Sequence, residues 1–235
     1  YDKIKELLLS HILGVWDYIK NYSKQKDKAT NFALDWIGML PGKRESRRLV
    51  GDVILTENDL RNNRQWSDRV CRSGWFLDNH IIGGILNKKE PAELSHIDEN
   101  YKNYTLVAPY AIPLRALYSR TIENLWMAGR DISVSHVALE SVRNQNILAN
   151  IGQAVGTAAT YSVAHNLNPR QVSTDESYIS EIQQQLIKDD VYVPDIENED
   201  IDDLVRNAEI KVSSEAQLDF GEPDEGHFEK LHQPP

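Results

Sequence analysis

A helix expected over residues 142–165 is rich in alanine and glycine, and this feature restricts the fold more than any other in the sequence. Small side chains let a helix approach a neighbouring surface closely, so one face of this helix should lie tightly against a sheet or a bound ligand. Tight packing alone would explain the pattern equally well. The small residues are Ala149, Gly152, Ala154, Gly156, Ala158 and Ala159.

The residues before this helix have the properties of a cofactor-binding turn. Residues 124–128 form a short apolar run, as expected of a buried strand, and Gly129, Arg130 and Asp131 follow it. A glycine there lets the backbone approach a cofactor, and the Asp131 carboxylate can accept hydrogen bonds from ribityl or ribose hydroxyls. The start of the next helix offers free N–H groups and about half a positive charge, which suit a flavin ring that becomes negative on reduction.

The remaining segments alternate between helical and extended patterns. Together they predict a fold between α/β and α+β, in which a mixed sheet carries the small-residue helix. The expected elements are an amphipathic helix over 3–20, strands over 48–56 and 105–114, an extended segment over 71–82, an acidic helix over 176–188 and a helical turn near 202–207.

Charge and cysteine content exclude several classes of protein. The net charge of −10 is concentrated after residue 170, where 18 acidic and 4 basic residues occur, so the first 170 residues carry +4. This chain has no concentrated basic surface of the kind that binds nucleic acid. The sequence contains no run of about 18 apolar residues, so no membrane-spanning helix is expected. Cys71 is alone, which excludes an intrachain disulfide and favours a buried, unreactive thiol.

Residues 124–160 carry a family resemblance. They read NLWMAGRDISVSHVALESVRNQNILANIGQAVGTAAT and resemble the C-terminal signature of the FAD-dependent oxidoreductases distantly related to fumarate reductase flavoproteins. Three further segments are similar to other parts of that family and follow the expected order. They are GKRESRRLVGDVILTENDL (42–60), SGWFLDNH (73–80) and YAIPLRALY (110–118).

The resemblance implies FAD as the cofactor and the C-terminal part of a Rossmann-like FAD-binding domain, joined to part of a mixed-sheet substrate domain. The family's GxGxxG segment is missing from the chain, and Gly83-Gly84 lacks the spacing to replace it. The expected division is a helical segment (1–40), a substrate-side region (41–120), the FAD-domain part (121–168) and an acidic linker or tail (169–235). Residues 183–215 resemble a linker found in carbohydrate-associated bacterial members, which suggests a small, sugar-derived substrate.

Four residues are predicted to act in catalysis. His136 could move a proton near the reactive edge of the flavin, or it could simply bond a loop carbonyl. Arg143 could bind a substrate carboxylate or hydroxyl, could compensate reduced flavin, or could form a salt bridge with Glu140 or Glu45. Asp78 and His80 lie two residues apart on an extended segment, so their side chains point to the same face. They could form an acid/base pair on the substrate side, or they could be a plain polar cluster at the end of a strand. These two ligands are too few for a metal site, and none is expected.

The predicted function is hydride transfer between an organic substrate and N5 of FAD. A non-catalytic structural or interaction module, derived from a truncated flavoprotein, is the alternative. The residues predicted to contact the cofactor are Gly129, Arg130, Asp131, Ser141, Asn144, Gly152 and Gln153.

Overall fold

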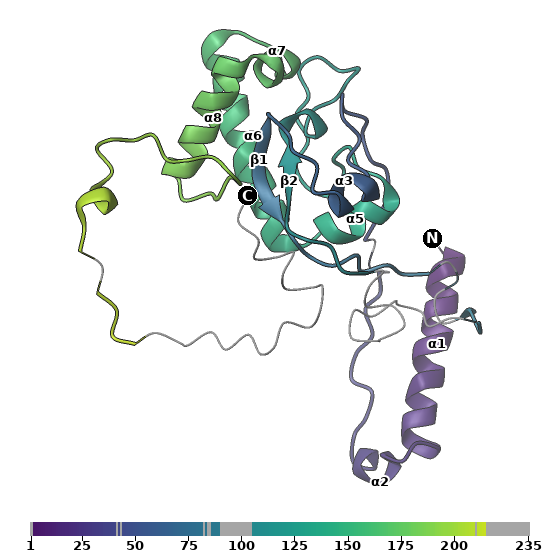
Figure 1. The fold of residues 1–235 in the computed structure, drawn as a ribbon. Coiled ribbons are helices and arrows are strands. Elements are labelled where there is room, and N and C mark those ends of the chain that lie inside the picture. Colours follow the sequence, from purple (N-terminus) through teal and green to yellow (C-terminus); the bar gives the residue numbers. More distant parts are fainter. Residues whose placement is uncertain are drawn as a thin grey trace. The chain divides into compact units, whose positions relative to one another are not determined.

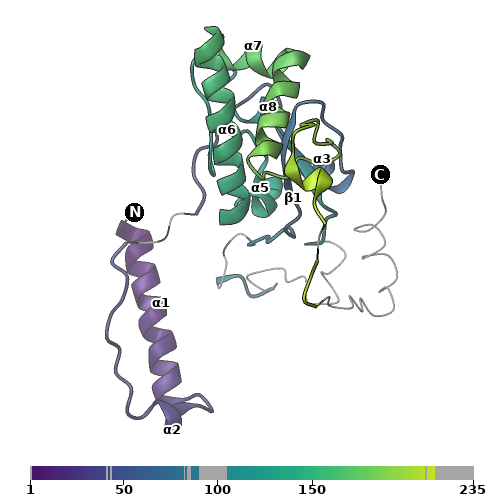
Figure 2. The same ribbon diagram turned by 90° about the vertical axis from the view of Figure 1, so that its left-hand side faces the viewer.

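The computed structural model describes residues 2–40, 42, 44–81, 83, 86–89, 105–209 and 211–214. The chain divides into two compact units, Tyr1–Ser46 and Arg47–Pro235, and each is described by itself (Figures 1 and 2). No helix among the described residues is long and apolar enough to cross a membrane.

The first unit is built on one long helix. Helix α1 (Asp2–Asn21) confirms the amphipathic helix expected over residues 3–20, and the short helix α2 (Lys26–Ala29) follows it. The Lys20 ammonium joins the two, because it donates to the carbonyls of Ala29, Thr30 and Phe32 at 2.8, 2.9 and 2.9 Å. Helix α1 has no buried residue.

The second unit is organised around a small antiparallel sheet. Strand β1 (Arg69–Ser73) pairs with β2 (Tyr110–Pro113), with Cys71 opposite Ile112 and a register shift between Arg69 and Cys71. A 3-10 turn, η2 (Leu114–Ala116), follows β2 directly. Helices α6 (Gln145–His165) and α8 (Glu176–Lys188) lie side by side and both contact β1 (Figures 1 and 2).

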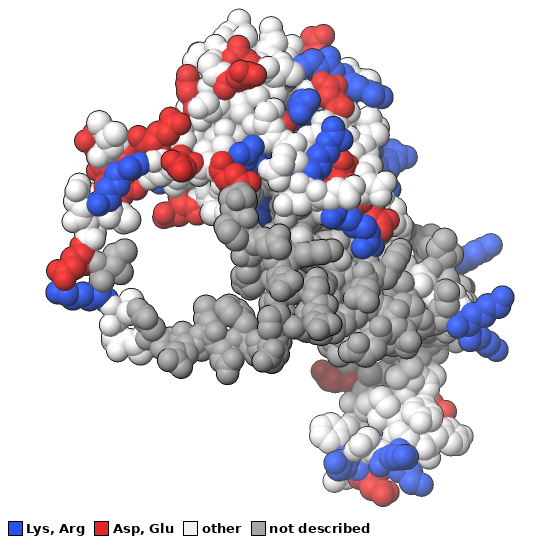
Figure 3. Space-filling model, in the orientation of Figure 1, with Lys and Arg blue, Asp and Glu red and all other residues white. Residues whose placement is uncertain are grey.

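Shorter helices complete this unit. Helix α3 (Glu57–Arg61) contacts α5 (His136–Val142), and α7 (Pro169–Thr174) contacts α6, α8 and η2. A second 3-10 turn, η3 (Leu204–Asn207), lies beyond α8. Acidic and basic side chains are intermixed over the part of this unit that Figure 3 shows.

The strands expected over residues 48–56 and 124–128 are replaced by single hydrogen bonds between extended segments. The Leu55 N–H donates to the Ser133 carbonyl at 3.0 Å, and the Ser135 N–H donates to that of Leu55 at 2.9 Å. The backbone at Gly51 lies close to that of Arg115, since a Cβ at this position would lie 2.6 Å from the Arg115 carbonyl oxygen. Residues 124–126 and 128 are not buried, so the prediction of a buried strand there was wrong. Among the described residues, the only ladder is β1–β2.

The small-residue helix is confirmed as α6, and a break separates it from α5. Arg143 ends α5, and Asn144 adopts an extended conformation (φ −65°, ψ 142°) before α6 begins. Helix α6 ends at His165, and the next residue, Asn166, takes the left-handed conformation that closes many helices. The two helices therefore start at separate N-termini, although the sequence predicted only one.

The hydrophobic core extends beyond residue 168, where the sequence predicted that a linker or tail begins. Val172, Ile182, Leu186, Val191 and Val193 belong to the same buried cluster as strand β1. Hydrogen bonds hold this part of the chain in place. The Arg69 guanidinium donates to the carbonyls of Pro194 (2.5 Å) and Asp195 (3.0 Å), and the Gln183 amide donates to those of Ser67 and Arg69. Residues 169–196 are thus part of the folded unit, while residues 215–235 of the expected tail lie outside the described residues.

Cys71 lies in this core as expected. It is fully buried on β1, and burial raises the pKa of its thiol to about 12. A thiol with so high a pKa is a poor nucleophile at neutral pH.

The extended core predicts different responses to the same substitution at two valines. We expect Val193→Ala to lower the free energy of unfolding by about 2 kcal/mol, because Val193 is 1% exposed and its loss leaves a cavity. Val205→Ala is the matched control, since Val205 is 66% exposed, and it should change that free energy by no more than about 0.5 kcal/mol. Urea unfolding followed by circular dichroism measures both. Equal effects would contradict the extended core.

Candidate functional site

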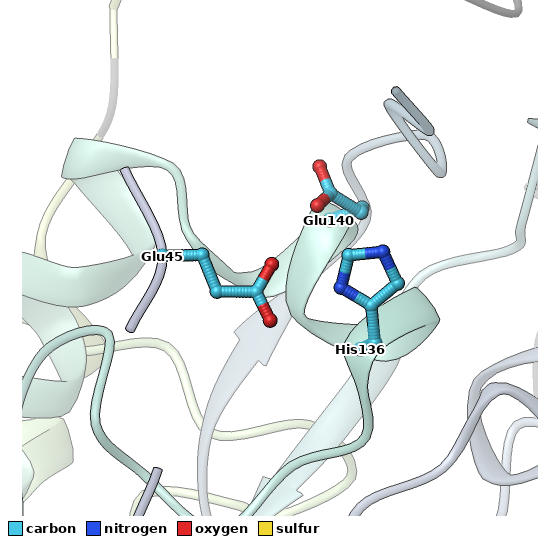
Figure 4. A group of neighbouring side chains, drawn as sticks. All are labelled: Glu45, His136 and Glu140. Atoms are coloured by element: carbon cyan, nitrogen blue, oxygen red, sulfur yellow. The ribbon is translucent and has the colours of Figure 1, made fainter. Parts of the chain in front are cut away.

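Helix α5 places two titratable side chains one turn apart. Ser135 caps the helix by accepting from the Ala138 N–H at 3.4 Å, His136 is the first helical residue, and Glu140 follows one turn later (Figure 4). A ring nitrogen of His136 and a carboxylate oxygen of Glu140 lie within 4.8 Å of each other. His136 is exposed, whereas Glu140 is 5% exposed, so the pair has one accessible and one buried member.

The segment after β1 brings Asp78 and His80 to the same place. His80 Nε2 lies 3.4 Å from Asp78 Oδ1. One ligand atom from each of Asp78, His80 and Glu140 lies within 4.8 Å of the others. Two segments far apart in the sequence therefore meet at the Glu140 carboxylate.

Arg143 ties the two segments together. Its Nε donates to Glu140 Oε2 at 2.7 Å, and its Nη2 donates to Asp78 Oδ2 at 2.6 Å and approaches Glu140 Oε2 at 2.7 Å. The Arg143 side chain is only 12% exposed, so these charge-assisted bonds are largely shielded from water. The salt bridge to Glu140 is among the partners that the sequence suggested for Arg143.

The structure thus gathers all four residues that the sequence predicted to act in catalysis. We call Asp78, His80, His136, Glu140 and Arg143 the Glu140 cluster. Sequence reasoning considered Glu140 only as a salt-bridge partner of Arg143. The spacing of Glu140 was nevertheless informative. Glu140 lies four residues after His136 and three residues before Arg143, and side chains at these spacings lie on one face of a helix.

Asp78, His80 and Glu140 are close enough together to hold a metal ion. However, the Arg143 guanidinium already contacts both carboxylates, at 2.6 and 2.7 Å. The Arg143 guanidinium therefore supplies positive charge to both carboxylates.

Ser141, which was predicted to contact the cofactor, lies in the core instead. It is fully buried, its hydroxyl lies 2.8 Å from the Tyr110 hydroxyl, and it donates to the Trp75 carbonyl. Burial also raises the pKa of Tyr110 above its usual range. With both hydrogen bonds made inside the protein, Ser141 holds α5 against β2 and the segment after β1.

The turn at Gly129 is open to solvent. Gly129 has φ +113°, a conformation that favours glycine, and it is half-buried between the exposed residues Ala128 and Arg130. Asp131 Oδ1 lies 3.6 Å from where a Cβ on Gly129 would be. The backbone of this turn is therefore accessible, and a carboxylate lies beside it.

The first backbone N–H groups of α6 have no hydrogen-bond partner among the residues that the structure describes. Asn144 occupies the N-cap position but makes no side-chain cap, and the first backbone bond within the helix comes from Leu148. Gln145 and Asn146 are exposed, so the first N–H groups of α6 can reach a ligand.

The exposed face of α6 is uncharged. The helix contains no Asp, Glu, Lys or Arg over its 21 residues, which is unusual for a helix in contact with water. A Cβ added at Gly152 or Gly156 would meet no atom within 4 Å, so this face is open. Its exposed residues are Gln145, Asn146, Ala149, Asn150, Gln153, Gly156, Thr160, Val163, Ala164 and His165.

Comparison with known proteins gives one clear finding. The model of the family described as FAD dependent oxidoreductase matches residues 2–186, which is more than half of the chain. No curated protein and no solved structure gives a significant match. The match includes the Glu140 cluster, the Gly129 turn and helix α6.

The buried ion pairs of Arg143 predict a strong coupling in stability. We expect Arg143→Gln to lower the free energy of unfolding by about 3 kcal/mol, because it leaves the Glu140 carboxylate buried without its guanidinium partner. Adding Glu140→Gln should restore part of that loss, and a double-mutant cycle in urea measures the coupling.

A second arginine provides the control for this cycle. Arg64 pairs with Asp59, but its side chain is 59% exposed, so Arg64→Gln should cost no more than about 1 kcal/mol. Additive effects of the Glu140 and Arg143 substitutions would show that their contact contributes nothing to stability.

Proposed function

Because the chain belongs to the FAD-dependent oxidoreductase family, we propose that it supplies flavin-facing and substrate-facing residues of an enzyme that transfers a hydride between an organic substrate and the flavin. FAD is the cofactor of this family. When bound, FAD supplies the electron-accepting centre of the reaction, while the protein supplies binding, orientation and electrostatics.

The observation that carries this proposal is the free N-terminus of α6 immediately after Arg143. The uncapped N–H groups of α6 would donate hydrogen bonds to the pyrimidine edge of a flavin. The helix dipole adds about half a positive charge at the same end. Both effects favour the ring when it carries negative charge, and Arg143 joins this end of the helix to the Glu140 cluster.

The residues around this helix fit a flavin nucleotide. The uncharged face of α6 admits a flat apolar group close to the backbone at Gly152, and the Gln153 amide is exposed beside it. The Gly129 turn offers accessible backbone, and Asp131 offers a carboxylate for a ribityl or ribose hydroxyl. We propose that Gly129, Arg130, Asp131, Asn144, Gly152 and Gln153 hold FAD.

The Glu140 cluster would handle the proton that accompanies hydride transfer. His136 is exposed and lies beside the buried Glu140, so its imidazole can accept a proton from a substrate hydroxyl or an activated C–H group. Asp78 and His80 form a second pair that can orient the substrate. We propose His136 as the general base, and Asp78, His80 and Arg143 as substrate-binding residues.

A titration with FAD tests the binding site. We expect the purified chain to perturb the visible absorbance of FAD, and Asn146→Asp to weaken binding about tenfold, because a carboxylate at the start of α6 offsets the positive helix end that attracts the electron-rich pyrimidine edge of the ring. The same change should slightly stabilise the helix, so the loss cannot come from unfolding. Asn150→Asp, one turn further on and equally exposed, is the matched control and should stay within about threefold. Equal losses in both variants would contradict the site.

Anaerobic reduction of the flavin tests the reaction. With alcohols and with neutral and acidic sugars as substrates, we expect one class to bleach the flavin, and His136→Gln to slow the bleaching by about 10²–10⁴-fold without changing FAD affinity. His165→Gln is the control, because His165 is exposed at the end of α6, where its ring bonds the Tyr161 carbonyl. An unchanged rate in His136→Gln would remove His136 as the base.

A further inference from the structure

Trp75 is a tryptophan exposed to solvent on the second unit. The residue is 46% exposed, whereas Trp66 in the same unit is 4% exposed. Tryptophan is a well-buried residue on average, because its large ring is mostly apolar. Single exposed apolar side chains are nevertheless common on protein surfaces. What distinguishes Trp75 is the way in which its backbone is held.

The backbone around Trp75 is fixed from inside the protein. Its carbonyl accepts a hydrogen bond from the Ser141 hydroxyl, and Ser141 is fully buried. Two residues later, the Leu77 side chain is fully buried in the core. The Phe76 ring lies 5.0 Å from the indole and is tilted by 32° relative to it. An aromatic side chain has only two rotatable bonds, so on a fixed backbone it offers a large contact surface and loses little entropy when a ligand binds.

Two contacts with α5 place Trp75 next to the Glu140 cluster. Ser141, which bonds the Trp75 carbonyl, directly follows Glu140 in the helix. Asp78, three residues after Trp75, pairs with Arg143 at 2.6 Å. The segment that starts at Trp75 therefore runs along the end of α5, where the cluster lies. The His80 side chain on this segment is 41% exposed, so the segment presents both an aromatic ring and a polar group to solvent.

A sugar ring matches this combination of surfaces. One face of a pyranose carries C–H groups with a slight positive charge, and it stacks on the face of an aromatic ring, which is slightly negative. The hydroxyls around the rim of the sugar both donate and accept hydrogen bonds, as required by a cluster of carboxylate, imidazole and guanidinium groups. An acyclic polyol has the same hydroxyls but lacks the rigid C–H face. Stacking on Trp75 would therefore favour the ring over the open chain.

We propose that Trp75 is the stacking surface for a sugar ring, and that the substrate handled by the Glu140 cluster is a pyranose or a similar cyclic polyol. The proposal rests on the proposed oxidoreductase site, to which it adds a substrate-binding residue and a substrate class.

Binding of simple sugars to the full chain tests the substrate class. The probes are methyl β-D-glucopyranoside and methyl β-D-galactopyranoside, with sorbitol as the acyclic control, and binding is followed by saturation-transfer NMR both without and with FAD. We expect at least one glycoside to bind about tenfold more tightly than sorbitol, with the strongest transfer to its ring C–H protons. Failure of both glycosides to bind in both conditions would overturn the proposal, as would equal binding of sorbitol.

Substitutions at Trp75 assign the binding to the indole. Trp75→Ala should weaken glycoside binding about tenfold, whereas Trp75→Tyr keeps an aromatic face and should stay within about threefold. Trp36→Ala is the matched control, since Trp36 is 76% exposed and belongs to the first unit, and it should leave the affinity unchanged. Circular dichroism checks that each variant is folded. If Trp75→Ala is not, Trp75→Leu, which keeps apolar bulk without an aromatic face, is read in the same way.

The outcomes separate this proposal from the flavin site. Unchanged glycoside affinity in Trp75→Ala, or equal losses in the alanine and tyrosine variants, would overturn the role of Trp75 without touching the FAD titration. Glycoside binding that depends on Trp75 in a chain that fails to bind FAD would support the stacking surface and contradict the flavin site alone.

Discussion

The Arg143 guanidinium, held between Glu140 and Asp78, is the interaction on which the site depends. The helix break at Asn144 puts Arg143 at the end of α5 and leaves the donors of α6 open directly after it. The same side chain fixes the segment that follows β1, so it aligns His80 with the end of α5. Without this arginine, two carboxylates would lie close together in a poorly screened environment, an arrangement that proteins avoid. The Arg143 side chain thus fixes how the two segments of the cluster lie relative to each other.

The helices could be predicted from the sequence, because their signals lie within a few consecutive residues. The helices over 3–20 and 176–188 and the small-residue helix are all present, because helical periodicity and capping act within a few residues. The expected strands over 48–56 and 124–128 failed for a different reason. Whether an extended segment joins a ladder depends on distant partners, which local patterns do not show. The general mixture of helix and sheet was predicted, but the size of the sheet was not.

The candidate site could be predicted in part for the same reason. His136, Arg143, Asp78 and His80 were chosen from motifs, and the fold brings them together, although their roles remain proposals. Glu140 was not chosen, because a glutamate inside a helix usually faces solvent and its burial cannot be read from spacing alone. Ser141 was predicted to contact the cofactor but makes its bonds to Tyr110 and Trp75, since its neighbours come from segments that the sequence does not place. Contacts between distant segments are what single-sequence reasoning lacks.

The bonds from Arg69 to the carbonyls of Pro194 and Asp195 show that the folded unit continues past the last residue that the family model matches. The family match ends at residue 186, but Val191 and Val193 belong to the same buried cluster as strand β1. A shortened polypeptide cut at the end of the match would uncover apolar side chains of the core and remove two acceptors of the half-buried Arg69. Such a product would tend to aggregate, although the cut removes no residue of the proposed site. A shortened protein should therefore keep at least the residues up to Ile196, which is the last of the described residues packed against the core.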